Sequence, residues 1–450
     1  MSFDAGIEGG TVVSSQGSRR ANVYFSGERI AAVTATREPA GTVFDAAGLL
    51  VMPGMIDSHV HLMDPGAPDR EDFPCGTAAA ARSGVTTVIE HTHGWPVRTR
   101  SDFEQKAAHL ASRSRVDFAL AAHAWPGELD QALEAWRAGA AFLKVFTCTT
   151  HGVPAHGPEQ LAELFAAGAA DGAVCLVHCE DEVLTSVAEQ RLRASGREDG
   201  GIIAQWRSLE AEVTAVNMVG RLARQAAARV VIAHASSLAS IAAAGRVEGG
   251  PISIETCPQY LTLMQEEADR LGALRKFTPP ARAANLGELD VMWNAVREGR
   301  VDIVSSDHAP STRAHKLDKS IWEAHFGLPG LDTTMGILLD AAASGRISYE
   351  RLVQVYSETP ARLYGLAPKK GALAIGADAD VVLVDPHHRW TVTDADILSH
   401  AGWSPYSGRE LTGRAVRTYV RGRLVMADGE VIAPPGTGAL LRGSGKARYS

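Results

Sequence analysis

The sequence predicts an α/β protein: a (β/α)8 barrel, or TIM barrel, with a small composite β-sandwich domain. Three observations support this architecture. Between residues 55 and 365, short apolar runs alternate with Ala-rich helical stretches in eight β-then-α units. The apolar runs are continuous, which is typical of parallel strands buried on both faces, and eight such units fit a closed barrel. Both chain ends carry short strand patterns separated by glycine turns.

The segments before and after the barrel are expected to form one domain. Residues 1–54 have the pattern of antiparallel hairpin strands, but so few strands make no stable core alone. Residues 366–433 supply further short strands, so 1–54 plus 366–433 would pair into the β-sandwich beside a barrel of residues 55–365. The tail 434–450 is rich in Gly, Ser and Arg and is expected to be flexible.

The barrel elements follow one another in a regular order. The expected strands are 49–58, 85–90, 117–122, 141–146, 173–178, 230–234, 251–255 and 301–306. The expected helices include 76–83, 102–113, 128–138, 158–170, 206–228 and 285–298. A doubly wound open sheet is the alternative fold, but no Gly-x-Gly-x-x-Gly fingerprint follows the first strand.

Composition argues against several classes of partner. The chain of 450 residues has a net charge of -8 and no basic run, so neither nucleic acid nor an anionic membrane is an expected partner. No apolar stretch reaches the roughly 18 residues of a membrane span, and the N-terminus lacks the pattern of a signal peptide. The five cysteines form no Cys-x-x-Cys pair and indicate no disulfide framework. We therefore expect a cytoplasmic protein.

Unusual residues stand at the ends of the predicted strands, where the chemistry of such barrels takes place. The first strand ends at His59 and His61, whose side chains an extended backbone points to the same side. The fifth and sixth strands end at His178 and His234, and the eighth ends at Asp307. Each alone could be a buried histidine or a helix N-cap. Together they predict a metal site, because imidazole is the commonest side-chain metal ligand.

Lys144, in the fourth strand, needs a separate explanation, because divalent metals repel an ammonium group. A neutral lysine can react with carbon dioxide to give a carbamate, an anionic bridge able to hold two metals. The alternative is a lysine paired with an acid such as Glu180 or Asp181. The strand position alone favours neither interpretation.

Several segments around these residues recur in a known order. They are Pro53-Gly54-Met55-Ile56-Asp57-Ser58-His59-Val60-His61-Leu62, Lys144-Val145-Phe146, Val177-His178-Cys179-Glu180, Ile232-Ala233-His234-Ala235-Ser236-Ser237, Glu255-Thr256-Cys257-Pro258-Gln259-Tyr260 and Ser305-Ser306-Asp307-His308-Ala309-Pro310. They resemble the motifs of the amidohydrolase superfamily, in its cyclic amidohydrolase branch of allantoinases, hydantoinases (dihydropyrimidinases) and dihydroorotases. The resemblance extends from about residue 45 to 430 and is closest to allantoinases.

This resemblance implies a binuclear hydrolase. The implied ligands are His59, His61 and Asp307 for one metal, His178 and His234 for the other, and carbamylated Lys144 (N6-carboxylysine) as the bridge. Zinc is the expected metal, because imidazole and carboxylate ligands with an open position suit it; iron, manganese and cobalt are alternatives. The implied nucleophile is a metal-bridging hydroxide, available at neutral pH because metals acidify bound water. Asp307 would be the general base and then the general acid.

The implied substrate is a small cyclic amide in a ureide or imide ring, opened in an allantoinase-like or hydantoinase-like reaction. Dihydroorotases carry a carboxylate-binding Arg where Met63 stands, and an Asn where His93 stands. Dihydroorotate is therefore disfavoured as the substrate, and a dihydroorotase-like enzyme is the alternative function. Thr149 replaces the Tyr that is usual in hydantoinases. Thr278 and Pro279 resemble a loop that contacts the ring amide. We therefore take His93, Thr149, Thr278 and Pro279 as candidate substrate contacts.

Other loop residues and other functions remain open at this stage. The candidate specificity residues on the same face are His91, His93, Trp95, His151 and His156, each of which could instead be an ordinary loop residue. A deaminase is disfavoured, because such relatives usually lack the bridging lysine. A non-catalytic dihydropyrimidinase-related scaffold is disfavoured, because all six ligand positions are filled. By analogy, a homodimer or homotetramer is expected.

Overall fold

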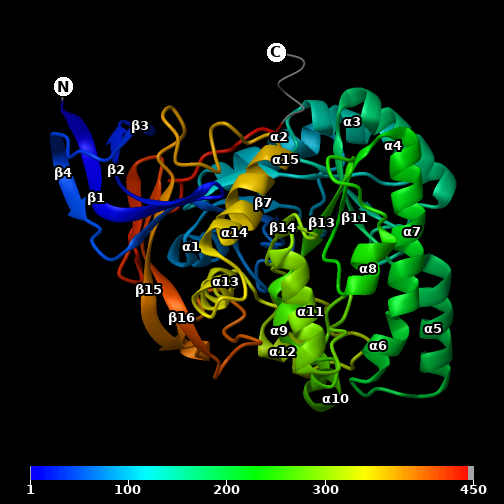
Figure 1. The fold of residues 1–450 in the computed structure, drawn as a ribbon. Coiled ribbons are helices and arrows are strands. Elements are labelled where there is room, and N and C mark those ends of the chain that lie inside the picture. Colours follow the sequence, from blue (N-terminus) through cyan, green and yellow to red (C-terminus); the bar gives the residue numbers. More distant parts are fainter. Residues whose placement is uncertain (1, 444–450) are drawn as a thin grey trace.

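Strands from both chain ends lie beside a barrel in the computed structural model, which describes residues 2–443 (Figure 1). The sheet occupies the left of this view, and the barrel with its helices occupies the right. This arrangement confirms the predicted fold class. No helix among residues 2–443 is both long and apolar enough to span a membrane.

Nine strands, contributed by both ends of the chain, form one sheet. They are β1 (Phe3–Ser14), β2 (Gly17–Ser26), β3 (Arg29–Thr34), β4 (Ala40–Asp45), β5 (Leu50–Pro53), β15 (Val381–Thr391), β16 (Glu410–Val420), β17 (Arg423–Ala427) and β18 (Glu430–Val431). Their order is β18-β17-β16-β15-β5-β1-β2-β3, with β4 beside β1. The antiparallel pair of β15 and β5 joins the two ends of the chain.

Strand β1 changes its parallel neighbour at two glycines, Gly9 and Gly10. Before Gly9, β1 pairs in parallel with β4, and after Gly10 it pairs in parallel with β5. A Cβ atom at Gly10 would lie 2.4 Å from Cγ2 of Val51, so only glycine allows this approach. Apolar side chains from both arms, such as Ile7, Val51 and Leu383, pack into one cluster. This folded sheet corresponds to the β-sandwich domain that the strand patterns at both chain ends predict.

Eight strand positions make up the barrel. The strands are β6 (Met55–Val60), β7 (Val85–Glu90), β8 (Asp117–Leu120) with its continuation β9 (Ala122–His123), β10 (Leu143–Phe146), β11 (Val174–His178), β12 (Arg229–Ile232), β13 (Ile252–Thr256) and β14 (Ile303–Val304). The run β6-β7-β8 and the run β9 to β14 are each parallel and meet at Ala121. The barrel closes where His308 pairs with Val60.

Helices follow most strands and cover the barrel (Figure 1). They are α1 (Phe73–Ser83), α2 (Arg100–Ala111), α3 (Leu129–Arg137), α4 (Pro158–Asp171), α5 (Glu182–Ala194), α6 (Ile202–Trp206), α7 (Leu209–Ala226), α8 (Leu238–Ala243), α9 (Pro258–Thr262), α10 (Glu267–Leu271), α11 (Leu286–Arg297), α12 (Arg313–Leu317), α13 (Thr334–Ala343), α14 (Tyr349–Val353) and α15 (Thr359–Leu363). The short elements are η1 (Gly272–Arg275), η2 (Gln354–Glu358) and η3 (Asp394–Asp396). The predicted helix 206–228 begins later, at Leu209, because Ser208 caps it and accepts a hydrogen bond from the Ala211 amide.

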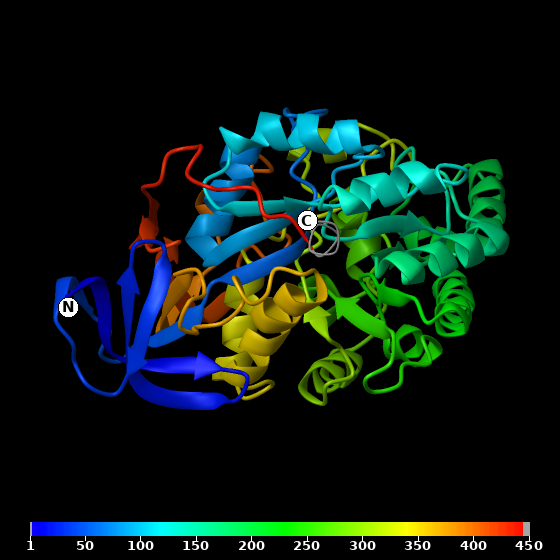
Figure 2. The same cartoon turned by 90° about the horizontal axis from the view of Figure 1, so that it is seen from above.

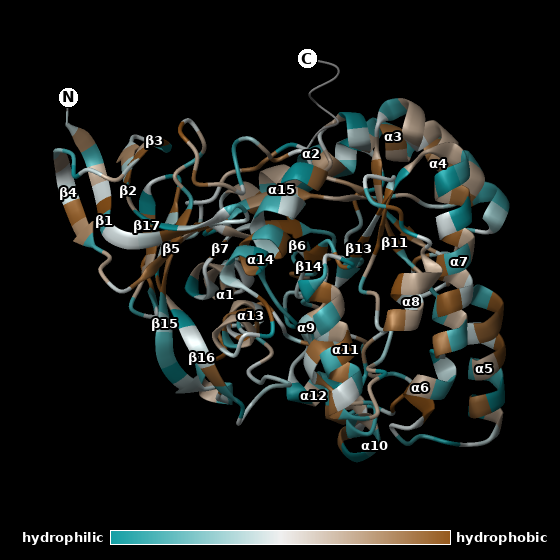
Figure 3. Ribbon diagram, viewed as in Figure 1, coloured by the Kyte–Doolittle hydropathy of each residue, from teal (hydrophilic) through white to brown (hydrophobic). Residues whose placement is uncertain are grey.

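Burial explains why the barrel strands could be found in the sequence. Every residue of β11 is buried, and this strand is mainly brown in the hydropathy view, whereas the helices around it mix hydrophobic and hydrophilic residues (Figure 3). Strands covered on both faces require continuous apolar runs. Helices covered on one face need only an apolar stripe.

Residues 434–443 do not form the free tail that their composition predicts. The Phe118 amide of β8 donates to the carbonyl oxygen of Ala439 (3.0 Å), and Leu440 forms a bridge with Phe118. The Ala439 amide donates to Asp117 Oδ1 (2.8 Å). Figure 2 shows this red segment running from the sheet back to the barrel. The prediction of a flexible tail is therefore wrong for 434–443, and residues 444–450 lie outside the described part of the chain.

Candidate metal centre and active-site cavity

The carboxyl ends of the barrel strands surround a cavity of about 310 Å³. All six predicted ligands form part of its wall: His59, His61, Lys144, His178, His234 and Asp307. They come from β6, β10 and β11 and from the residues that follow β6, β12 and β14. The barrel therefore brings together side chains that lie up to 248 positions apart in the sequence, His59 to Asp307.

Two histidines and the aspartate form one half of the centre. His59 Nε2 lies 3.1 Å from Asp307 Oδ1, and His61 Nε2 lies 3.6 Å from the same oxygen. Burial and the neighbouring Lys144 hold the pKa of both histidines well below the usual value. Both imidazoles are therefore neutral near pH 7, as metal ligation requires.

The buried carboxyl group of Glu255 orients His59; burial raises its pKa to about 8, although Lys144 and the His234 amide act in the opposite direction. The Nδ1–H group of His59 donates to Glu255 Oε1 (2.7 Å), which leaves the lone pair of Nε2 directed towards the cavity. The His234 amide donates to the same oxygen (3.2 Å). A carboxylate behind a histidine ligand is a frequent arrangement in metal sites. Glu255 is within a recognised sequence motif, but the motif did not reveal this contact.

The other half of the centre is a pair of facing histidines. His178 Nδ1 lies 2.9 Å from His234 Nε2. The Nε2–H group of His178 donates to Glu180 Oε2 (2.7 Å), so its Nδ1 keeps a lone pair. Burial lowers the pKa of both imidazoles. Two neutral imidazole nitrogens at this separation can both ligate one cation that lies to the side of the line joining them.

Glu180 is occupied by this histidine and by two further residues. It accepts from Arg207 Nη1 (3.3 Å) and from Thr278 Oγ1 (2.7 Å). Burial raises its pKa, but Arg207 and His178 lower it more, to about 2. Glu180 is thus an anion that holds His178, and it is not the partner of Lys144.

Lys144 lies between the two halves. Its Nζ is 3.4 Å from His59 Nε2, and no carboxylate among residues 2–443 lies within 4.0 Å of it. Burial lowers the pKa of the amine to about 8, although Asp307 and Glu255 act in the opposite direction. A larger fraction of this amine is therefore neutral near pH 7 than of an exposed lysine, and only a neutral amine adds carbon dioxide.

The backbone is strained at four residues of the cavity wall. Met63, His151, His234 and Asp307 have φ angles of 58°, 55°, 38° and 49°. Residues other than glycine seldom adopt this left-handed backbone region, which costs about 1–2 kcal/mol of conformational free energy per residue. Such strain concentrates at functional sites, and two of these four residues are predicted metal ligands.

Three of the other predicted histidines lie close to the ligands. His93 and His151 both line the cavity, and their rings stack with centroids 4.9 Å apart. His91 is buried behind the wall, with its ring centroid 4.3 Å from that of His61 and 4.4 Å from that of His59. Neither ring nitrogen of His91 has a hydrogen-bond partner within the described part of the chain.

The remaining predicted contacts divide into one that reaches the cavity and four that do not. Thr278 lines it. Thr149 is exposed, and its amide donates to Glu182 (2.5 Å). The carbonyl of Pro279 accepts from the Tyr260 hydroxyl (2.8 Å). Trp95 and His156 also lie outside the wall, and His156 borders a separate cavity.

Sequence reasoning proposed no role for several residues of the wall, among them Arg70, His325, Phe326 and Gly327. Arg70 comes from the loop between β6 and α1, and His325, Phe326 and Gly327 come from the loop after α12. None of them ends a barrel strand, so the pattern that revealed the ligands could not reveal these residues. The signal that could have found them is the presence of basic or aromatic residues in the loops that follow barrel strands.

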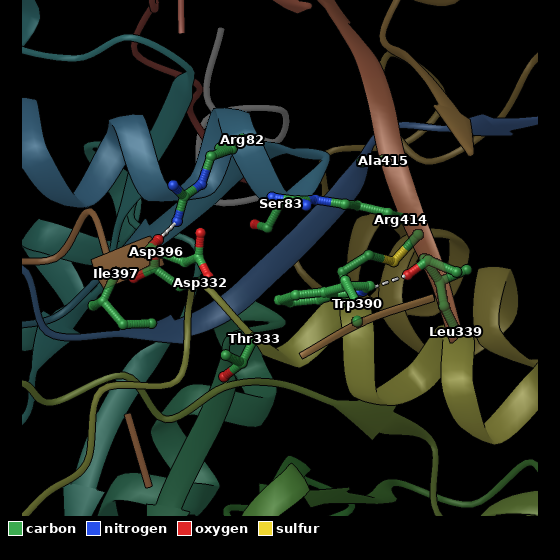
Figure 4. A pocket seen from close by; sticks show the side chains of 13 residues that line it. Arg82, Ser83, Asp332, Thr333, Leu339, Trp390, Asp396, Ile397, Arg414 and Ala415 are labelled. Atoms are coloured by element: carbon green, nitrogen blue, oxygen red, sulfur yellow. Dashed lines mark hydrogen bonds and ion pairs between the residues drawn. The ribbon is translucent and has the colours of Figure 1, made fainter. Parts of the chain in front are cut away.

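A second cavity, where the sheet meets the barrel, is too small for a substrate (Figure 4). Its volume is about 30 Å³, close to the volume that one water molecule occupies in the liquid. Arg82 donates to Asp332 Oδ1 (2.9 Å), and the indole of Trp390 donates to the carbonyl of Gly413 (3.1 Å). These polar groups already have partners, so we place the active site at the barrel mouth.

Known proteins match almost the whole chain. The chain is 35% identical over 443 residues to an allantoinase from Rubrobacter xylanophilus, covering 96% of each chain. It is 34% identical over 413 residues to a dihydroorotase from Halobacterium salinarum, covering 92% of this chain and 94% of that one. The solved L-hydantoinase (dihydropyrimidinase) from Arthrobacter aurescens superimposes with a TM-score of 0.92 at 32% identity, covering 98% of this chain and 100% of that chain.

The family assignment agrees with the motifs around the six ligand positions. The sequence model of the Amidohydrolase family matches residues 50–425, which include the whole barrel and most of the sheet from the C-terminal end. The likeness extends over both domains and includes the cavity. The chain therefore belongs to the amidohydrolase family.

Proposed function

We propose that the protein hydrolyses a C–N bond in the ring of a small cyclic amide, a ureide or an imide, with two divalent metal ions, zinc being the first candidate. One observation carries this proposal. Six side chains able to hold two metals converge on one cavity at the strand ends, and its volume of about 310 Å³ suits a small ring.

The donor set fits two cations. The proposed ligands are His59, His61 and Asp307 for one metal, His178 and His234 for the other, and carbamylated Lys144 between them. When bound, such metals would polarise the amide carbonyl and lower the pKa of a water molecule. The neutral imidazoles, and the amine of Lys144, which forms no ion pair with any other described residue, support this assignment.

Asp307 is the proposed general base and general acid. Its Oδ1 faces His59 and His61, which leaves Oδ2 to take a proton from the attacking water and deliver it to the leaving ring nitrogen. Burial raises its pKa to about 7, against the effect of Lys144. A group that titrates near neutral pH can both accept and return a proton.

The other wall residues would position the ring. His93 and His151 form a stacked pair, and the Phe326 ring lies 5.9 Å from His151, so one side of the cavity is aromatic. The hydroxyl of Thr278 donates to Glu180, so towards a substrate it can only accept a hydrogen bond. We retain His93 and Thr278 as proposed contacts on this basis.

A hydrolysis screen with metal analysis tests the proposal. The purified protein, loaded with zinc, would be assayed on allantoin, hydantoin, dihydrouracil, dihydroorotate and cyclic imides, with about two metals per chain expected. Ring opening gives a new carboxylate without ammonia. Release of ammonia from an intact ring would instead identify a deaminase. Absence of turnover on every ring by the two-metal protein would refute the proposal.

A further inference from the structure

The guanidinium group of Arg70 lines the cavity without an anionic partner. Its Nε donates to the carbonyl of Pro310 (3.1 Å) and to Ser311 Oγ (3.0 Å). These two bonds direct the group, but both acceptors are neutral. No carboxylate among residues 2–443 lies within 4.0 Å of it, and Nη1 and Nη2 have no hydrogen-bond partner in this part of the chain. A half-buried cation in this state is ready to receive an anion.

Two acids that precede Arg70 in the sequence are paired with other residues. Asp69 lies 3.2 Å from His315 Nε2. Burial lowers the pKa of Arg70 to about 10, against the charge of Asp69, which makes no ion pair with the guanidinium. Asp64 accepts from Arg113 (2.7 Å). These contacts hold the loop from outside and leave Arg70 facing the cavity.

Glu71, which follows Arg70, anchors the loop on its other side. It is fully buried, its Oε2 accepts from the hydroxyl of Ser399, and its Oε1 accepts from the His400 amide (3.3 Å). The backbone amide of Arg70 donates to the carbonyl of Ala67 (2.9 Å). The loop is thus fixed before and after Arg70, so its side chain starts from a defined position.

The cavity wall contains little negative charge to balance this cation. Asp307 is the only acid of the wall within the described residues, and it is a proposed metal ligand. Lys276 and Lys316, buried behind the loop of Phe326, donate only to backbone carbonyls, at 2.5–3.1 Å. Burial lowers the pKa of both amines, that of Lys276 to about 7, so neither carries a full positive charge near pH 7. The scarcity of acids in the wall is what leaves Arg70 open to an anion.

We infer that the substrate is a cyclic amide that carries a carboxylate, and that Arg70 binds this carboxylate through Nη1 and Nη2. A planar guanidinium matches the two oxygens of a carboxylate. The inference rests on the proposed function for its ring chemistry. Met63 stands at the position where dihydroorotases carry a carboxylate-binding arginine. In this cavity the guanidinium comes instead from Arg70, seven residues later.

The first test compares two ring substrates of similar size. The zinc-loaded protein would be assayed on hydantoin-5-acetate and on its primary amide, and kcat/KM measured for each. We expect the carboxylate to be preferred about 10- to 100-fold, the usual worth of a charge-assisted hydrogen-bonded pair. Arg70→Gln should reduce this ratio to within about threefold of one. Arg389→Gln, which changes an exposed arginine on the far strand β15, should keep the wild-type ratio.

A binding measurement separates this inference from the proposed function. Cyclopentylacetate has no ring C–N bond, and its binding can be followed by calorimetry on the wild type and on Arg70→Gln. We expect the variant to bind it at least tenfold more weakly. Arg70-dependent binding without turnover of any ring would leave the anion site standing and refute the proposed function. Turnover with no preference for the carboxylate, or an equal loss on both substrates in Arg70→Gln, would refute the anion site.

Discussion

Burial keeps the histidines of the cavity ready to bind metal. His59 and His178 each donate one ring proton to a buried carboxyl oxygen, of Glu255 and Glu180 respectively, and so present the other nitrogen to the cavity. The carboxyl groups fix the orientation of the rings, and the low pKa values keep the imidazoles neutral. Lys144 has no such fixed partner, so its chemistry decides whether two metals can be held.

The first prediction at this scale concerns Lys144. Lys144→Ala should remove the anionic bridge and lower kcat at least 1,000-fold, a loss of about 4 kcal/mol in transition-state stabilisation. Short carboxylic acids such as acetate and propionate should restore part of the activity, because they can bridge the metals in place of the carbamate. Metal analysis should show fewer than two metals per chain. Full activity of the variant would contradict the bridging role.

A second prediction concerns the carboxyl group behind His59. Glu255→Gln keeps the shape of the side chain but offers a weaker acceptor to the Nδ1–H group of His59 and to the His234 amide. We expect metal affinity to fall about 10- to 100-fold, as is usual when such a partner is lost. Competition with a chelating dye measures this affinity directly. The control is Glu410→Gln on the exposed end of β16, which should bind metal as the wild type does.

At the scale of elements, buried side chains fix the two loops that complete the cavity, often through hydrogen bonds to backbone groups. The loop of Phe326 is anchored by Lys276, whose ammonium group donates to the carbonyls of Ile321 (2.6 Å), Trp322 (3.1 Å) and Ala324 (2.5 Å). The same Nζ lies 4.4 Å from the centroid of the Phe326 ring. One side chain therefore sets the position of one wall.

The prediction for this loop is made on Lys276. Lys276→Met should leave three carbonyls without their donor and lower the free energy of unfolding by about 2 kcal/mol or more. KM should rise more than kcat falls, because the loop shapes the substrate pocket and carries no metal ligand. Urea unfolding and steady-state kinetics measure the two effects. Lys319→Met, at an exposed lysine next to the same loop, should change neither quantity.

The strand ends could be predicted from the sequence, together with loop residues such as His93 and His151, whereas the rest of the loop wall could not. His59, His61 and Asp307 follow from two rules, the alternation of side chains along a strand and the meeting of parallel strand ends at one mouth. Arg70 reaches the same cavity through a loop whose path depends on distant partners, such as Pro310 and Ser311. No local pattern contains that information. For the same reason Thr149, placed by analogy with hydantoinases, lies outside the cavity wall.

At the scale of the whole molecule, a buried ionic cluster connects the sheet to the barrel. Lys370 lies between Asp117 at the start of β8 and two aspartates before β15, Asp378 and Asp380, at 2.5, 3.0 and 2.7 Å. Asp117 also pairs with Arg421 of the sheet domain. The cluster lies at the amino ends of the barrel strands, opposite the cavity. Asp117 lies far from its partners in the sequence, so the composition of the segments predicted two domains but could not predict the ion pairs that join them.

The last prediction separates this junction from the chemistry. Lys370→Met would remove the cation that three buried carboxylates share. Asp117 keeps Arg421 and Asp378 keeps Arg29, so the cost should lie at or below the roughly 3–5 kcal/mol of a fully broken buried ion pair. The loss should appear as a lower urea midpoint, while metal content and KM at low temperature stay near wild-type values, because the cluster lies at the other end of the barrel. The neighbouring Lys369 is exposed, so Lys369→Met should keep wild-type stability. If Lys370→Met were as stable as Lys369→Met, the packing of apolar strands, and not this cluster, would hold the two domains together.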